Sequence, residues 1–248
     1  MTEVTSVGEV AAAWEPQLPG RRAARQITDA LVEPNWEGLG VAAALTEDAA
    51  AAFAYGEEIA IPGELGEALR VAFEAVDAVI EGRITTKALQ GGEGTRLKLP
   101  KVERSPLLIP RGLMKNLSDD PLTRAKERTR KAAEAERKVL EALAAGEPHG
   151  FVAIDLLWLD GQSLLGVPLL ERKRLLDAVL TASQLVRITT FVQATSIGML
   201  MTWGSQGFAE ISYRGANSRY LPGVENPDWA ITRVPEGPHE AARPAPSV

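Results

Sequence analysis

Two carboxylates and an amide share the stretch VEPNWEGLG, at Glu33, Asn35 and Glu37. This spacing suggests a general acid and base around one reacting group, but such chemistry also needs a nucleophile or a metal. The sequence has no cysteine and only two histidines, which excludes thiolate catalysis, cysteine zinc sites and most triad chemistry. We therefore expect no metal site, and we interpret Glu33 and Glu37 as members of salt bridges.

A second group of residues is basic. Between Arg96 and Lys138 there are 13 Lys or Arg against 6 Asp or Glu, a local net charge of +7 in a chain whose total is −6. Basic side chains at this density suit contact with a nucleic-acid backbone. The alternative is a solvated surface helix with intrahelical ion pairs. The candidate nucleic-acid contacts are Lys98, Lys101, Arg124, Arg128 and Lys131.

The elements that must position these residues follow from hydrophobic periodicity and turn residues. We expect an arm at 1–26, one α+β domain at 27–234 with a basic loop and helix insertion at about 87–146, and a disordered tail at 235–248. The elements expected in the domain are strands within 27–61, a helix at 62–75, a strand at 77–85, a helix at 121–145, a strand at 151–159, a helix at 169–182, a strand at 185–190, a helix ending near 203, and strands at 209–213 and 229–233.

Some local features stay open or carry separate expectations. The alanine-rich stretch Asp48–Ala54 fits a strand or a helix, because alanine is a poor strand former. His149 and His239 lie beside proline or glycine and are predicted to be exposed, whereas Trp158, Trp203 and Trp229 are predicted to be core residues. The apolar stretches are too short to span a bilayer and the N-terminus has no signal core, so we expect a cytoplasmic protein without a membrane partner.

The stretch FVAIDLLWLDGQSLLGVPLLERKRLL at 151–176 resembles the middle of the adenylation domain of ATP-dependent DNA ligases, where vaFDLLyLDG-dLr-lPLxeRRxxL is typical. Further segments resemble the same family in the same order and cover about 27–233. They are VEPNWEGLG at 32–40, ELGEALRVAF at 64–73, AVIEGRI at 78–84, QGFAEISYRGANSRYLPG at 206–223 and DWAITR at 228–233. The resemblance implies the ATP-grasp-like fold of DNA ligases and mRNA-capping nucleotidyltransferases, with antiparallel sheets flanked by helices.

The resemblance also implies a nucleotide pocket whose residues have changed. Asn35 stands where the family has the lysine that attacks ATP, and an amide nitrogen is not a nucleophile, so no catalytic residue is assigned. Ile154 replaces an adenine-stacking phenylalanine, Arg83 a glutamate and Gly40 an arginine. The pocket candidates are Glu33, Asn35, Glu37, Gly38, Arg83, Ile154, Arg214 and Arg233.

Two interpretations of the changed pocket remain open. Arg83, Arg214 and Arg233 could form a basic pocket that binds phosphate, or they could pair with Glu33, Glu37 and Glu81 across a collapsed pocket. Lys87, Lys98 or Lys101 could replace Asn35 as the nucleophile. The short sequence after Arg233 also predicts that the OB-fold domain of active ligases is missing.

These features lead to a degenerate ligase-like protein as the first hypothesis. It would be catalytically inactive and would act as a DNA- or protein-binding accessory in DNA repair. One alternative is a divergent ATP-dependent ligase or nucleotidyltransferase, and only this alternative requires ATP and Mg. The other is a protein-interaction module that binds an active ligase or a second copy of the chain.

Overall fold

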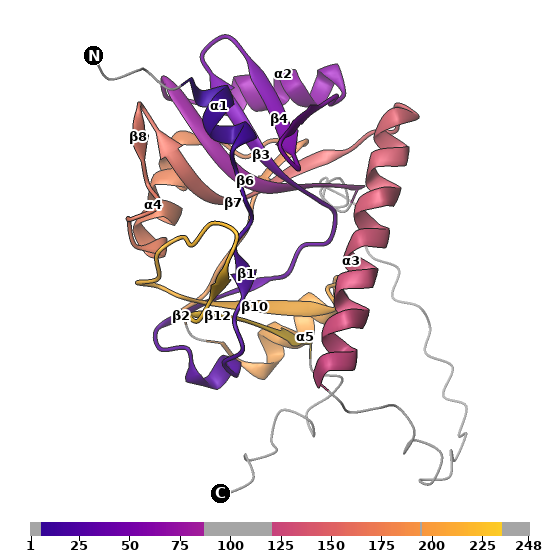
Figure 1. The fold of residues 1–248 in the computed structure, drawn as a ribbon, viewed down its shortest axis with the longest axis vertical. Helices are drawn as coiled ribbons and strands as arrows, with labels where there is room; N and C mark the ends of the chain where they lie inside the picture. Colours follow the sequence, from indigo (N-terminus) through magenta and orange to yellow (C-terminus); the bar gives the residue numbers. More distant parts are fainter. Residues whose placement is uncertain (1–5, 87–120, 194, 235–248) are drawn as a thin grey trace, which may run out of the picture.

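The computed structural model describes residues 6–86, 121–193 and 195–234, and for 121–129 and 131–132 it describes the helix but not the side chains. Lys87, Lys98, Lys101 and His239 therefore lie outside the described residues, as do the expected basic loop and tail. The described chain is an α+β fold in which antiparallel sheets are flanked by helices (Figure 1), which confirms the predicted fold class.

The larger sheet has seven strands in the order β5-β4-β3-β6-β7-β8, with β9 parallel to β7 at its side. The bounds are β3 Leu39–Thr46, β4 Ala50–Ala54, β5 Glu57–Ile59, β6 Asp77–Thr85, β7 Gly150–Leu159, β8 Gln162–Ser163 and β9 Val186–Ile188. Gly82 of β6 pairs with Ala153 of β7. A Cβ there would lie 2.2 Å from the Phe151 ring, so only glycine fits at this point.

The smaller sheet is antiparallel and has the order β12-β10-β2, with β2 at Ala30–Pro34, β10 at Glu210–Gly215 and β12 at Trp229–Arg233. Two short strands, β1 at Leu18–Pro19 and β11 at Glu225–Asn226, pair in parallel beside it. The chain enters the larger sheet directly after β2, so the residues that end β2 lie where the two sheets meet.

Helices cover both faces of the larger sheet. Helices α2 (Gly63–Ala72) and α4 (Leu169–Val179) bury leucines in the core on one face, where alternate β3 residues such as Val41 and Leu45 point. Helix α1 (Val7–Ala12) covers the other face, over Ala42 and Ala44. Successive side chains of a strand point to opposite faces of the sheet. The β3 residues therefore contribute alternately to the core under α2 and α4 and to the core under α1.

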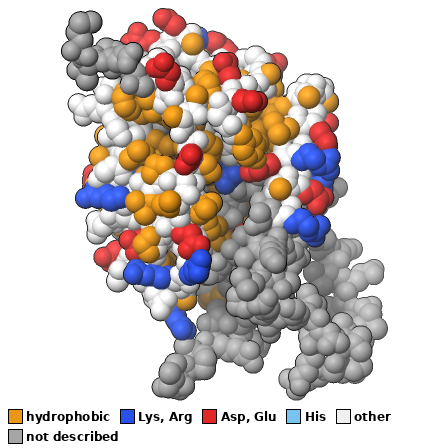
Figure 2. All heavy atoms as spheres, in the orientation of Figure 1, with side chains coloured by type: hydrophobic (Ala, Val, Ile, Leu, Met, Phe, Trp, Pro, Cys, Tyr) orange, Lys and Arg blue, Asp and Glu red, His pale blue; other side chains and the backbone are white. Residues whose placement is uncertain are grey.

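The remaining helices are α5 (Ile197–Ser205), the 3₁₀ turn η1 (Ala24–Gln26) and the long helix α3 (Pro121–Ala144). Helix α3 contacts β3, and its residues Val139 and Leu143 pack on the core. Figure 2 shows acidic and basic side chains mixed along the described part of α3. Within the described chain, no helix has both the length and the apolar content needed to cross a bilayer.

The segment from Ser6 to Gln26, which we call the strap, joins the two sheets. Its helix α1 packs on β3, β4 and β6, whereas β1 pairs with β11 beside the smaller sheet. The Trp14 indole N–H donates to the Tyr220 hydroxyl at 2.9 Å, and the Asn226 amide donates to Gln17 at 2.9 Å. The predicted arm thus has its own short elements and packs on the domain.

Two local expectations are decided by the structure. Asp48–Ala54 contains strand β4, and the helical alternative is wrong, because Tyr55 and Gly56 adopt positive φ (55° and 83°) and turn the chain back into β5. The prediction that His149 is exposed is also wrong. His149 is 2% exposed at the start of β7, and one ring nitrogen contacts the Glu147 carbonyl. Trp203 and Trp229 are buried as predicted, and Trp158 is half-buried.

Candidate functional site

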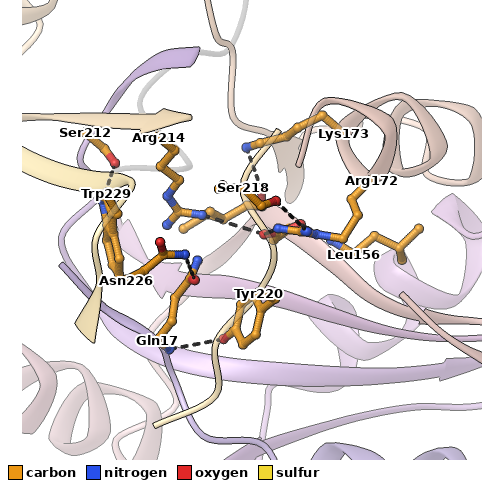
Figure 3. A network of polar contacts seen from close by, with 12 residues as sticks. Gln17, Leu156, Arg172, Lys173, Ser212, Arg214, Ser218, Tyr220, Asn226 and Trp229 are labelled. Atoms are coloured by element: carbon orange, nitrogen blue, oxygen red, sulfur yellow. Dashed lines mark hydrogen bonds and ion pairs between the residues drawn. The ribbon is translucent and has the colours of Figure 1, made fainter. Parts of the chain in front are cut away.

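Six charged residues are buried together where the two sheets meet. Three are carboxylates and three are cations, so their formal charges sum to zero. They come from β2, β6, β7, α4 and β10, and Figure 3 shows Arg172, Lys173 and Arg214 converging on one region. The members of this charged cluster are Glu33, Glu81, Asp155, Arg172, Lys173 and Arg214.

Asp155 and Arg172 form the best-satisfied pair in the cluster. Arg172 Nε donates to Asp155 Oδ1 at 2.8 Å and Nη2 donates to Oδ2 at 2.7 Å, a bidentate arrangement between side chains that are 1% and 0% exposed. Arg172 Nη1 also donates to the Val167 carbonyl at 2.5 Å. The pair therefore links β7 to α4 and to the turn before it.

Lys173 is a member of the charged cluster that was not among the residues expected from the sequence. Its Nζ donates to Glu33 Oε2 at 2.7 Å and to the Ile154 carbonyl at 2.5 Å. The available signal was the helical spacing of the buried α4 positions, which are Leu169, Arg172, Lys173 and Leu176. With two acceptors engaged, the amine acts as a structural cation that joins α4 to β2 and β7.

Arg214 lies between two carboxylates without forming a close hydrogen bond to either. Its Nε is 3.7 Å from Glu33 Oε1, its Nη1 is 3.8 Å from Asp155 Oδ2, and its guanidinium lies 4.5 Å from the centre of the Trp229 ring. Among the described residues, Arg214 Nε and Nη1, Glu33 Oε1 and Glu81 Oε2 are buried without a hydrogen-bond partner. The cluster thus retains polar atoms with unused hydrogen-bonding capacity.

The environment shifts the two buried carboxyl groups of the larger sheet in opposite directions. Burial raises the pKa of Glu81 above its ordinary value, and Arg214 only partly opposes this effect. Burial alone would also raise the pKa of Asp155, but Arg172, followed by Arg214 and Lys173, brings the net pKa of Asp155 below its ordinary value. Asp155 is therefore the stable anion of the cluster, and Glu81 bears an electrostatic cost when it ionises.

Asn35 follows β2 at the edge of this cluster. Its backbone N–H donates to the Glu210 carbonyl at 3.0 Å, and its side-chain Nδ2 donates to Glu210 Oε2 at 3.1 Å. Glu37 is exposed, and Gly38, at φ 135°, has Ile84 O 2.4 Å from where a Cβ would lie. The asparagine amide is thus used in a contact between β2 and β10.

The three arginines that were candidates for one basic pocket have separate surroundings. Arg214 is inside the charged cluster, whereas Arg83 lies on β6 and pairs with Glu136 of α3 at 3.4 Å. Arg233 is exposed at the end of β12, where its backbone pairs with Glu210. Ile154 is 8% exposed, and its carbonyl accepts from Lys173. Of these candidates, Arg214 lies in the buried charged cluster, whereas Arg83 lies at its partly exposed edge, which we call the rim.

The nucleic-acid candidates lie elsewhere. Arg124, Arg128 and Lys131 belong to α3, and Lys98 and Lys101 lie outside the described residues. In the described half of α3, the exposed pairs Arg137–Glu141 and Lys138–Glu134 form at i,i+4 spacing. This half therefore matches the expectation of a solvated helix with internal ion pairs.

The buried donor set does not fit a magnesium triphosphate. Glu33 and Asp155 are already bonded to internal cations, and the charged cluster is neutral as a whole. Within the described part of the chain, no group of three or more His, Cys, Asp or Glu has a metal-binding arrangement. We derive no metal-dependent step from these residues.

A shallow surface cavity of about 360 Å³ lies apart from the charged cluster. It is lined by Gly20, Arg21, Arg22, Gln26, Glu225 and Pro227. Two exposed ion pairs, Arg21–Glu225 and Arg22–Asp228, border it. Because none of its lining residues is buried and charged, we place the candidate site at the charged cluster and its rim instead.

Comparison with solved structures identifies the fold. The ligase domain of LigD from M. tuberculosis superposes with a TM-score of 0.54 at 16% identity, over 90% of this chain and 60% of that one. A mycobacterial DNA ligase D complexed with ATP and MES gives 0.53 at 15% identity, over 88% and 59%. No protein-family model matches the sequence, and the search of curated proteins gave no match.

At these identities the likeness concerns the fold. The fold is that of the adenylation domain of ATP-dependent DNA ligases, and the chain spans about 60% of the length of the two ligase chains it matches. The order of the resembling sequence segments and the fold agree with each other. Whether the pocket still reacts depends on the residues within it.

Replacement of Asp155 by asparagine should strongly destabilise the fold. The change leaves Arg172 buried without its carboxylate, which typically costs about 3–5 kcal/mol. Urea unfolding at neutral pH measures the loss. Asp228→Asn is the control, because its ion pair with Arg22 is exposed and should contribute at most about 1 kcal/mol. Equal losses in the two variants would contradict the assigned importance of the buried pair.

Replacement of Glu81 by glutamine should change the pH dependence of stability. Because the pKa of Glu81 is raised in the folded chain, the folded state holds this proton more tightly, and wild-type stability falls as pH rises above the ordinary glutamate pKa of about 4.3. Glu81→Gln removes that loss, so the variant should gain stability relative to wild type between pH 4 and pH 8. Urea unfolding across this range tests the sign.

The exposed carboxylate Glu57 provides the control for removal of one negative charge. The difference between Glu81→Gln and wild type should grow with pH beyond that of Glu57→Gln. A difference that stays constant, or that shrinks as pH rises, would contradict the raised pKa of Glu81.

Proposed function

We propose that this chain is a ligase-fold protein that forms no lysine adenylate and acts as a DNA- or protein-binding accessory in DNA repair, in the cytoplasm. The carrying observation is the contact of the Asn35 amide with Glu210. The family resemblance assigns this position to the nucleophile. The lone pair of an amide nitrogen is delocalised into the adjacent carbonyl, so Asn35 has no nucleophilic amine to attack phosphorus.

The buried lysine of the charged cluster supports the same proposal. Lys173 Nζ donates to the carboxylate of Glu33 and to the carbonyl of Ile154, and its side chain is 1% exposed. An attacking amine must be deprotonated and must reach the phosphate, whereas this ammonium is held by two acceptors. The proposal is that Lys173 maintains the fold and does not replace the missing nucleophile.

A binding role is supported by the distribution of charge. The chain is acidic overall, yet the segment from Arg96 to Lys138 carries a net charge of +7, and α3 presents part of that segment as a helix. Contacts with phosphates would need basic side chains but no adenylation chemistry. This separation allows a ligase fold to bind DNA ends without sealing them.

The purified chain should form no covalent AMP adduct with ATP labelled at the α-phosphate, in the presence of magnesium or manganese. Intact-protein mass spectrometry, which detects added AMP, provides the second measurement. Asn35→Lys should remain unlabelled, because the surrounding donor set does not fit the metal-bound nucleotide. Stoichiometric labelling of wild type would overturn the proposal, and Lys173→Arg would then test whether Lys173 is the labelled residue.

Binding to a 5′-phosphorylated DNA duplex should weaken steeply with salt if the accessory role involves DNA. Reversal of Arg124, Arg128 and Lys131 to glutamate should reduce affinity and lower the slope of log K against log salt by about 0.9 for each lost phosphate contact. Fluorescence anisotropy measures both. Arg137→Glu with Lys138→Glu is the control, because these residues pair within α3. Absence of binding by wild type would contradict a DNA partner.

A further inference from the structure

Arg83 lies on β6 directly opposite Gly40 of β3, and the glycine makes room for it. A Cβ at position 40 would lie 2.6 Å from Arg83 Nη1 and 3.3 Å from its Cζ, so the guanidinium rests on the β3 backbone. The Trp14 ring of the strap lies 3.7 Å from the same point. Position 40 must therefore lack a side chain for Arg83 to take this place.

Among the described residues, the guanidinium of Arg83 has hydrogen-bond partners at one nitrogen only. Nη1 is 3.5 Å from the Gly38 carbonyl and 3.4 Å from Glu136 Oε1, both near the outer limit for a hydrogen bond. Nε and Nη2 have no hydrogen bond to any residue of the described chain. The side chain is 28% exposed, so a ligand can reach it at the rim of the charged cluster.

Glu136 brings a negative charge to this arginine from α3. Its other oxygen accepts a short hydrogen bond from the Tyr55 hydroxyl, and partial burial together with Glu136 raises the pKa of Tyr55 to about 12. Val139, one turn further along α3, packs on the core and keeps the helix against the sheet. Glu136 is therefore a fixed internal anion at the Arg83 guanidinium.

We propose that the Arg83 guanidinium is a binding site for a phosphate group and that Glu136 competes with the phosphate for this guanidinium. This inference deepens the proposed function and rests on it, because a protein that binds DNA or a nucleotide without adenylation still needs a phosphate contact. A planar guanidinium whose Nε–Nη2 edge has no partner in the described part of the chain suits two phosphate oxygens. The ligand is a phosphate of a nucleotide or of a nucleic-acid end.

Calorimetric titration with sodium tripolyphosphate at low ionic strength measures the affinity of the Arg83 site for phosphate. Glu136→Gln keeps an acceptor for Tyr55 but removes the competing charge, so it should bind about two- to tenfold more tightly than wild type. Glu134→Gln, two residues earlier and paired with Lys138 in the helix, should behave as wild type. Arg83→Gln should lose the binding, and Arg83→Lys should restore only part of it because lysine lacks the fork.

Repetition with ATP and with a 5′-phosphorylated duplex distinguishes the source of the phosphate. If Glu136→Gln binds only ATP more tightly, the Arg83 site is assigned to nucleotides. If it binds only the duplex more tightly, the site is assigned to nucleic-acid ends. Circular dichroism and urea unfolding confirm that each variant is folded. If Glu136→Gln shows no gain in affinity for tripolyphosphate, or if folded Arg83→Gln binds it like wild type, the proposed phosphate site is overturned.

The two proposals fail in different ways. Covalent AMP in the labelling assay overturns the absence of adenylation but leaves the affinity of Arg83 for phosphate unaffected. Unchanged tripolyphosphate binding in Glu136→Gln and Arg83→Gln overturns the proposed phosphate site and leaves the labelling result as it stands.

Discussion

The bidentate pair between Asp155 and Arg172 is the interaction on which the rest of the site depends. It fixes α4 against β7 and orients the next residue, Lys173, toward Glu33 at the end of β2. Each buried charge is tolerated because another lies beside it, since an isolated ion in this environment would be very costly. The junction of the two sheets is therefore built from charges that stabilise the fold only as a set.

This dependence bears on two pairs of residues, one that matches the ligase pattern and one that departs from it. Asp155 and Arg172 match the ligase pattern and are fully buried, where loss of either would leave an unpaired charge. Gly40 and Arg83 depart from the pattern together, and they face each other across β3 and β6 at the rim. A position in partial contact with solvent can exchange its charge at little cost in stability.

Local sequence signals predicted the elements well, because hydrophobic spacing and turn residues act over a few positions. The alanine-rich strand was ambiguous for the same reason. Alanine has a weak preference, and β4 is decided by pairing with β3 and by the turn at Tyr55. The expected proximity of Glu33 and Arg214 is present in the structure. The partners Lys173 of Glu33 and Glu136 of Arg83 were not expected, because these residues lie 140 and 53 positions from their partners and such contacts leave no local pattern.

Unused hydrogen-bonding capacity is distributed differently inside the charged cluster and at its rim. Inside the charged cluster, Arg214 has donors without partners, but carboxylates on both sides balance its charge, so a polyphosphate would gain little there. At the rim, Arg83 Nε and Nη2 have no hydrogen-bond partner among the described residues, and Glu136 Oε1 lies 3.4 Å from Nη1. The proposed attraction for phosphate is therefore greatest at Arg83, whereas the position that the ligase resemblance assigns to the nucleophile holds Asn35, whose amide is bonded to Glu210.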